Sequence, residues 1–324
     1  AAPALAVRWS AFGDDEPAIG WLVAFGYIST MALYAFTFSS YFCTSFSIAS
    51  HPWIHQLVAG LVILFFAMVN LISVKGMGKL EDVMVYTKII LLILISALLT
   101  WKGDIGQALP LIETESSWAG ILMIAAVTFV AYEGFQLVIH AYHEVEAPER
   151  NIPRAIYGAI TVATVLYVVL AIGALATIPK AEIIAGKEYA LAAGSESVLG
   201  KLGYFAVLLG ALLATSSAIS GTLFGASRLM AVIADDGYFP KALRVRIKGH
   251  IPRNAIWTMF VLAFLLLLAG GLQLILEFGS VTFIIVSFFM ALANFKKRRE
   301  TDSHVILTLV AMICLFVAGI LILW

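Results

Sequence analysis

Apolar residues run along this chain in long blocks separated by short polar segments. Nine blocks of about 20 residues or more are apolar almost throughout, and they cover residues 18–48, 54–74, 83–101, 118–143, 153–178, 203–233, 254–272, 273–294 and 304–324. A continuous block of this length spans a bilayer as a helix, whereas the strands of a membrane barrel alternate apolar and polar positions. The pattern therefore predicts nine membrane-spanning helices and an all-α fold.

Composition supports this class. Hydrophobic residues make up 62% of the chain and charged residues only 12%, and the mean hydropathy is +0.99. These values lie far outside the range of soluble domains. The sequence is therefore that of a multi-pass integral membrane protein whose first partner is the lipid bilayer.

The distribution of positive charge predicts the orientation. If the first span starts in the cytoplasm, the cytoplasmic segments hold fourteen cations and the opposite side only four, namely Lys102, Lys180, Lys187 and Lys201. Cytoplasmic loops of membrane proteins carry an excess of Lys and Arg. We therefore expect the residues before Trp21 and the connection between the second and third blocks to be cytoplasmic, and the protein to lie in the cell (plasma) inner membrane.

Two charged residues lie deep in the apolar blocks, and Glu277, which follows Gly270 and Gly271 near the end of a block, is a weaker third. Lys88 lies in VMVYTKIILLILI and Glu133 lies in FVAYEGFQ. Ionisable residues at such positions usually face a bundle interior or a water-filled cavity and are functional candidates. Alternatives stay open for both: Lys88 is six residues past Asp82 and could extend to the interface, and Glu133 could be a protonated, hydrogen-bonded structural carboxyl.

A glycine follows Glu133 near the middle of its block. A helix interrupted at this depth exposes backbone carbonyls and amides, which are tolerated only where they line a cavity or bind a ligand. The two half-helix ends also bring partial charges that suit a small zwitterion. Glu133 and Gly134 therefore indicate a possible ligand site, although a single glycine also occurs in unbroken packed helices.

Three motifs in order resemble the amino acid-polyamine-organocation (APC) permeases. Residues 128–156, TFVAYEGFQLVIHAYHEVEAPERNIPRAI, are similar to the broken sixth span of that superfamily and its acidic loop. Residues 70–92, NLISVKGMGKLEDVMVYTKIILL, are similar to its fourth-to-fifth span connection, and residues 216–243, SSAISGTLFGASRLMAVIADDGYFPKAL, to its eighth span and following loop. The resemblance implies a LeuT-like inverted-repeat helical bundle with a substrate site at the midplane.

The resemblance also implies a division of the chain. The whole of 1–324 would be one transmembrane domain, in which 17–101 is the remainder of the first repeat with spans three to five. Residues 118–294 would be the second repeat with spans six to ten, and 304–324 an additional span eleven. Since residues 17–49 match the third span, we expect the first two spans of the superfamily to be lacking from this sequence, one of which completes the substrate site.

The substrate site implied by the resemblance lies at the break. The backbone carbonyls that end the first half-helix would receive a substrate ammonium, Gly134 would give the break, and Phe135 would form a pocket wall. The carbonyls belong to Phe129, Val130, Ala131, Tyr132 and Glu133. Phe129 also matches the aromatic gate position, and core packing is the alternative for each aromatic. Glu133 could add a carboxylate that favours cationic substrates or proton coupling.

A coupling site is implied on two other spans. Ser216 and Ser217 are similar to a hydroxyl pair that binds sodium in sodium-coupled proteins of this fold. Lys88 resembles a fifth-span lysine that takes the place of the sodium in proton-coupled relatives. An ammonium can substitute for a monovalent cation, so protonated Lys88 would hold one state of the bundle and its deprotonation would release another.

The chain is thus expected to be a secondary active amino acid transporter. It is not expected to be an enzyme, because its sequence has no nucleotide-phosphate loop and no convincing nucleophile triad. We expect proton-coupled symport of a neutral or cationic amino acid by alternating access. The alternatives are a sodium-coupled or exchanging amino acid or polyamine permease, and a transporter-fold receptor or scaffold. No cofactor, metal site or nucleic-acid partner is expected.

Overall fold

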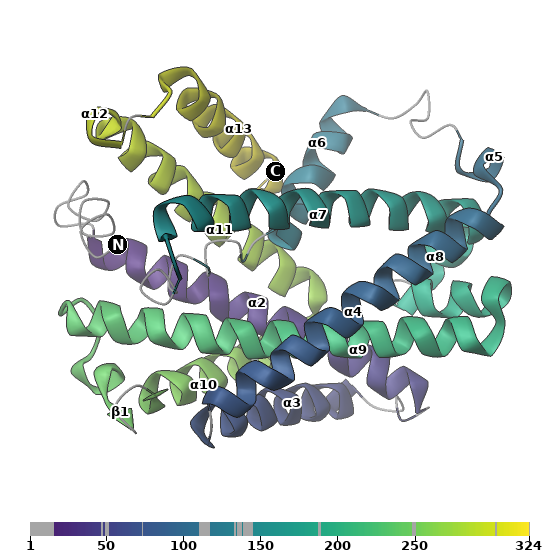
Figure 1. The fold of residues 1–324 in the computed structure, drawn as a ribbon, viewed down its shortest axis with the longest axis horizontal. Helices are drawn as coiled ribbons and strands as arrows, with labels where there is room; N and C mark the ends of the chain where they lie inside the picture. The colour runs from purple at the N-terminus through teal and green to yellow at the C-terminus, as the bar shows by residue number, and fades with distance from the viewer. Residues whose placement is uncertain are drawn as a thin grey trace. The chain divides into compact units, whose positions relative to one another are not determined.

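The structure is a computed structural model, and it describes residues 16–46, 48, 52–72, 74–109, 117–132, 134, 138, 145–186, 189–247, 251–301 and 303–323. Helices dominate it (Figure 1). The elements are α2 (Glu16–Ser45), α3 (Pro52–Ile72), α4 (Val74–Lys102), α5 (Ile105–Ala108), α6 (Trp118–Val127), η2 (Thr128–Tyr132), α7 (Pro148–Thr177), α8 (Lys180–Gly186), α9 (Ala190–Asp235), η5 (Lys241–Arg244), β1 (Arg246–Ile247), β2 (Ile251–Pro252), α10 (Arg253–Ala269), α11 (Leu272–Lys296), α12 (Arg298–Thr301) and α13 (Val305–Leu323). Strands β1 and β2 form a short antiparallel pair.

Among the described residues, seven helices are long and apolar enough to cross a membrane, and two apolar helices are shorter. The seven lie in α2, α3, α4, α7, α9, α11 and α13, and the shorter two are α6 and α10. The all-α membrane class is thus confirmed. The two shorter helices correspond to predicted blocks: α6 gives way to a 3₁₀ helix at Thr128, and α10 ends at Ala269 before the pair Gly270 and Gly271.

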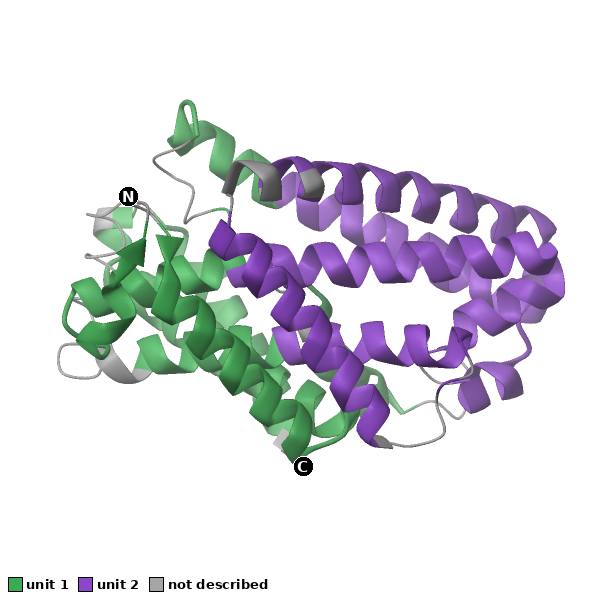
Figure 2. Ribbon diagram, turned by 90° about the horizontal axis from the view of Figure 1, so that it is seen from below, with its two compact units in different colours: residues 1–30, 116–156, 224–324 green, residues 31–115, 157–223 purple. Residues whose placement is uncertain are grey.

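The chain divides into two compact units (Figure 2). Unit 1 comprises residues 1–30, 116–156 and 224–324, and unit 2 comprises residues 31–115 and 157–223. Each unit is built from segments that are far apart in the sequence, and α2, α7 and α9 each contribute residues to both. The expected division into repeats and a final span stays a prediction.

Aromatic rings organise the core of unit 1. The ring of Trp21 on α2 lies 4.2 Å from that of Phe239, centroid to centroid. Tyr27 meets Phe283 of α11 edge to face at 5.5 Å, which is a favoured geometry for two aromatic rings. Gly26 lets this approach happen, because an added Cβ would lie 3.0 Å from the Phe283 ring. Helix α11 also packs against α6 and α13.

A hydrophobic cluster in unit 2 joins α2, α4 and α9. Its buried members are Tyr41, Ile95, Leu99, Ala192, Val207 and Leu208. The end of α4 is fastened to the end of α7, because the backbone N–H of Asp104 donates to the Ala176 carbonyl at 2.9 Å. A Cβ on Gly173 of α7 would lie 3.1 Å from Leu99 Cβ. Glycine at this position allows the two helices to pack closely.

Helix α9 contains a break that the apolar pattern anticipates. Gly200 has non-helical angles (φ 67°, ψ −166°), so the segment before it is a separate helical piece from the span that follows. The hydroxyl of Tyr189 donates to that of Tyr204 across this break. Burial and this hydrogen bond raise the pKa of Tyr189.

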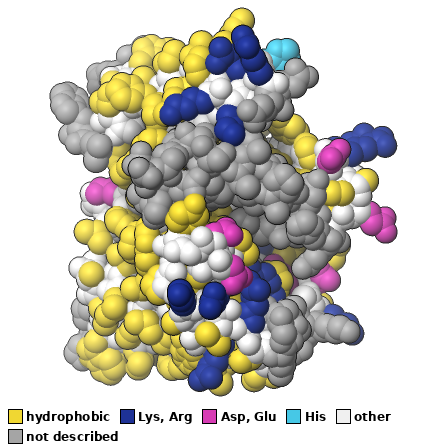
Figure 3. Space-filling model, turned by 90° about the vertical axis from the view of Figure 1, so that its left-hand side faces the viewer, with side chains coloured by type: hydrophobic (Ala, Val, Ile, Leu, Met, Phe, Trp, Pro, Cys, Tyr) yellow, Lys and Arg dark blue, Asp and Glu magenta, His cyan; other side chains and the backbone are white. Residues whose placement is uncertain are grey.

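Hydrophobic side chains lie exposed on the molecule, and Figure 3 shows them over much of the face that it draws. The helix α13 is an example, with Ile306 at 76% and Leu307 at 68% exposure. An exposed apolar surface of this kind is expected where helices face lipid tails.

The contact between α9 and the residue after α7 gives a stability prediction. A Cβ on Gly194 would clash with the side chain of Ile178, which is only 1% exposed. Gly194→Ala should therefore destabilise the protein by about 1–3 kcal/mol through overpacking. Gly158→Ala on α7 is the matched control, because nothing lies within 4 Å of the added Cβ. Thermal unfolding in detergent should show a lower midpoint for Gly194→Ala alone, and equal midpoints would contradict the packing.

Candidate functional site

The broken helix begins with α6, which keeps α-helical geometry for only 10 residues. At its end the hydroxyl of Thr128 donates to the Ile124 carbonyl at 2.8 Å, and η2 continues the chain as a 3₁₀ helix to Tyr132. Gly134 then has φ +117°, in a region that side-chain-bearing residues rarely adopt. The chain thus leaves α geometry after Val127, earlier than the sequence indicates, and Gly134 has a non-helical φ. That this is the break of a substrate site stays a prediction.

Ser280 of α11 marks the place where the helix changes. Its side chain is fully buried, and its hydroxyl donates to the Val127 carbonyl at 2.9 Å. The last carbonyls of an α-helix have no partner within the helix, so this bond satisfies one of them inside an apolar environment. The sequence does not distinguish Ser280, because the same block also carries the hydroxyls of Thr282 and Ser287.

The predicted substrate residues are placed in part. Phe129 is half-buried, Ala131 and Tyr132 are exposed, and Gly134 is half-buried. The side chain of Val130, and the residues Glu133 and Phe135, lie outside the described residues. The orientation of the Glu133 carboxylate, which the sequence left open, is therefore not among the described features.

Lys88 of α4 meets α9 inside unit 2. Its ammonium Nζ donates to Ser217 Oγ at 2.7 Å. The Ser217 hydroxyl donates its own proton to the Ala214 carbonyl at 3.0 Å, so toward Lys88 the oxygen acts as an acceptor. Two residues 129 positions apart are thus joined at the place where the resemblance expects a coupling site.

Both Ser216 and Ser217 are buried. Lys88 is half-buried. A charge-assisted bond is stronger than a neutral one, and an ammonium within a membrane span needs such partners. Ser216 is adjacent to Ser217 on α9, so the predicted hydroxyl pair and the lysine occupy one region. Residues 129–134 belong to unit 1, whereas Lys88, Ser216 and Ser217 belong to unit 2. Each group is therefore described within its own unit.

No group of three metal-binding side chains occurs within the described ranges of the chain. His140 and His143, which have helical spacing of three, lie outside those ranges. Among the residues that the structure places, the polar chemistry therefore lies in hydroxyls, a lysine and backbone groups rather than in metal ligands.

Comparison with known families settles the class of this protein. The sequence profile of the amino acid permease family matches residues 13–324. The chain belongs to the amino acid permease family. The family is one of permeases rather than enzymes, in agreement with the interpretation of the sequence, and with the seven apolar helices it makes this a multi-pass membrane protein.

Curated relatives are similar over much of the permease. An uncharacterized protein of Methanocaldococcus jannaschii is 26% identical over 88% of this chain and 66% of its own length. The inner membrane transport protein YbaT of Escherichia coli is 28% identical over 75% of this chain and 55% of its own length. The b(0,+)-type amino acid transporter 1 of Mus musculus is 26% identical over 78% of this chain and 53% of its own length. The permease thus spans between 53% and 66% of the length of these relatives.

Proposed function

We propose that the intact protein carries an amino acid across the membrane by proton-coupled symport. Its family is that of amino acid permeases, and one relative is named as an amino acid transporter. The observation that carries the coupling is the bond between Lys88 Nζ and Ser217 Oγ within apolar helices. A lysine held there by a hydroxyl can take the place of a bound cation and can also lose a proton.

The substrate site in this proposal is the end of the first half of the broken helix. Carbonyls of residues 129–133 would receive the substrate ammonium, with Phe129 as the gate and Phe135 as a wall. The early end of α6 and the positive φ of Gly134 support a backbone that departs from helical geometry here. Such backbone is tolerated within a membrane where it is buried in protein or lines a cavity. The substrate ammonium would find partial negative charge there.

Coupling would then follow from two states of the Lys88 region. With Lys88 protonated, its bond to Ser217 holds α4 against α9 in one state. When Lys88 loses its proton, the attraction weakens and the bundle can adopt the other state, as alternating access requires. A LeuT-like fold with inverted repeats and a place in the cell (plasma) inner membrane complete the proposal. The E. coli relative is named as an inner membrane transport protein, which supports that location.

Uptake by the intact protein in proteoliposomes tests the proposal. A panel of labelled neutral and cationic amino acids is offered with and without an inward proton gradient, in the absence of sodium. The proposal expects accumulation of at least one amino acid that depends on the gradient. A sodium requirement, or amino acid binding without any uptake, would contradict it and favour a sodium-coupled permease or a receptor respectively.

A further inference from the structure

A second ionisable residue lies on the same face of α4 as Lys88. We propose that Glu81 passes the proton of Lys88 to the end of α4 that the loop charges assign to the cytoplasm. The inference rests on the proposed proton coupling and names a further residue in it. Glu81 is half-buried and precedes Lys88 by seven positions, which is close to two full turns of an α-helix.

The carboxylate of Glu81 approaches α9 at a glycine. A Cβ placed on Gly221 would lie 3.0 Å from Glu81 Oε1, so the carboxyl occupies the space that any other side chain would need. Gly221 follows Ser217 by four positions, and Lys88 bonds Ser217. Along this contact α4 and α9 therefore run antiparallel, with Lys88 opposite Ser217 and Glu81 opposite Gly221. Both contacts lie within unit 2.

The two ionisable groups meet α9 one helical turn apart. Ser217, the partner of Lys88, and Gly221, which Glu81 approaches, are separated by about 6 Å along α9, because each helical residue rises 1.5 Å. Among the described residues no hydrogen bond or ion pair joins Lys88 to Glu81 directly, so the transfer that we propose runs through a bridging water. The hydroxyl of Ser220, in the same turn of α9, is buried and has no hydrogen-bond partner among the described residues. Such an orphan group suits a site that holds water.

Few other charged side chains lie on the helices around Lys88 and Glu81. The charges that act on Glu81 are those of Lys88, which is attractive, and of the neighbouring Asp82, which is repulsive. On α9, no acidic or basic residue occurs between Lys201 and Arg228. Helix α3 packs against α4, and its only ionisable side chain is His55. His55 lies near the start of α3, at the end opposite to the connection with α4. Within the described parts of α3, α4 and α9, the opposite charge that acts on each of these two groups is therefore that of the other.

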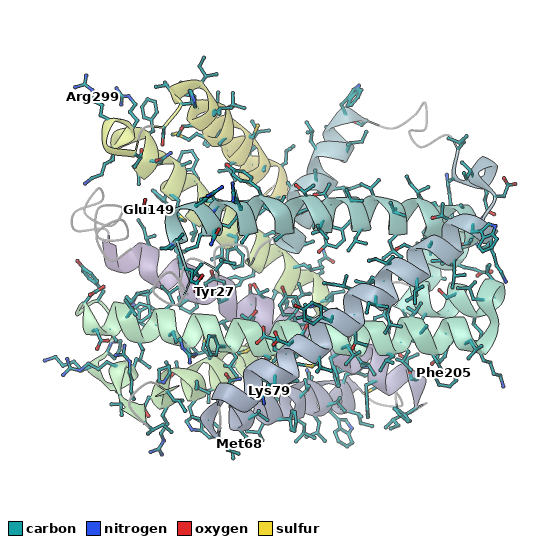
Figure 4. All side chains as sticks on the ribbon, viewed as in Figure 1. Tyr27, Met68, Lys79, Glu149, Phe205 and Arg299 are labelled. Atoms are coloured by element: carbon teal, nitrogen blue, oxygen red, sulfur yellow. The ribbon has the colours of Figure 1, made fainter. Side chains whose placement is uncertain are left out.

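The end of α4 beyond Glu81 leads to solvent. Figure 4 shows Lys79 at this end of α4, where α3 carries Met68, and Lys79 is exposed. The transfer is balanced: the Lys88 ammonium gives one proton through the bridging water to the Glu81 carboxylate, and the Glu81 carboxyl then gives one proton to solvent water. Lys88 regains a proton from the opposite side of the membrane in the next cycle. One proton thus crosses for each return of the pair to its starting state.

Glu81→Gln in the intact protein tests the inference. Glutamine keeps the shape of the side chain but cannot carry the proton. In proteoliposomes the initial rate of gradient-driven amino acid uptake should fall at least about tenfold, which is less than the roughly hundredfold that a positioned acid or base typically contributes. Exchange of internal for external amino acid, which needs no net proton release, should stay within about twofold of the unchanged protein. Glu182→Gln, which makes the same change at an exposed carboxylate of α8, is the matched control and should change neither rate.

Two further measurements separate a proton carrier from a structural charge. Glu81→Asp keeps a carboxyl and should retain more gradient-driven uptake than Glu81→Gln, and it serves if the glutamine variant does not fold. Deuterated water should slow uptake by Glu81→Gln more than uptake by the unchanged protein, because proton exchange then limits the rate. Normal gradient-driven uptake by Glu81→Gln, with loss of it in Lys88→Ala, would overturn this inference alone. Normal uptake by both variants would overturn the proposed proton coupling itself.

Discussion

Uptake driven by a proton gradient should be lost when Lys88 is replaced by alanine. The variant removes the ammonium that donates to Ser217 Oγ at 2.7 Å and with it the only described basic group on α4 between Lys79 and Lys102. We expect the initial rate to fall at least about tenfold, since a group that carries a proton at an essential step contributes that much or more. The measurement is gradient-driven uptake of labelled amino acid into proteoliposomes containing the intact protein.

Lys88→Arg sharpens this prediction. Arginine keeps the positive charge but does not lose its proton in proteins, so it can hold the protonated state and cannot complete the cycle. We expect Lys88→Arg to fold and to bind amino acid, yet to lack gradient-driven uptake. Lys79→Ala is the matched control, because Lys79 lies on the same helix and is exposed. Normal gradient-driven uptake by Lys88→Arg would show that charge alone suffices, against a step in which Lys88 is deprotonated.

Gly134→Val should damage transport at the broken helix. Gly134 has φ +117°, which costs a residue with a side chain about 1–3 kcal/mol. The added Cβ would meet no atom within 4 Å, so the expected loss comes from backbone strain rather than from a clash. We expect uptake to fall by at least about fivefold, which corresponds to about 1 kcal/mol. A β-branched residue is stiffer than alanine at this place, so Gly134→Ala should lose less.

Gly120→Ala is the control for this glycine. Gly120 lies within α6, and nothing lies within 4 Å of an added Cβ there either. Because it is inside a regular helix, alanine should stabilise it by up to about 1 kcal/mol and leave uptake unchanged. If Gly134→Val and Gly120→Ala both leave uptake unchanged, the positive φ of Gly134 has no part in transport.

Local patterns predicted the helices well because each span carries its own signal. Blocks of apolar residues have nearly the bounds of α2, α3 and α11, for example 54–74 against Pro52–Ile72 for α3. The place where α6 leaves α geometry was predicted less well. Gly134 is visible in the sequence, but the early change at Val127 coincides with a bond from Ser280, a residue 153 positions away. Contacts of that range leave no local trace.

Two residues of α4 illustrate the same limit. Lys88 stands out in the sequence because a charge in an apolar block is unusual, and the resemblance pairs it with Ser217, which the structure brings to it. Glu81 does not stand out because it adjoins Asp82 at the edge of the block, where charges are ordinary. Only the approach of its carboxyl to Gly221 on another helix distinguishes it from its exposed neighbour. A glycine opposite a carboxylate becomes informative when the register between two helices is known.

The most direct test of proton-coupled transport is to count protons and amino acid together. Proteoliposomes containing the intact protein and a trapped pH-sensitive dye receive amino acid without sodium, and labelled substrate is counted in parallel. The proposal predicts that amino acid entry acidifies the lumen in proportion to uptake, and that Lys88→Ala shows no such acidification. Amino acid accumulation without movement of protons would contradict it.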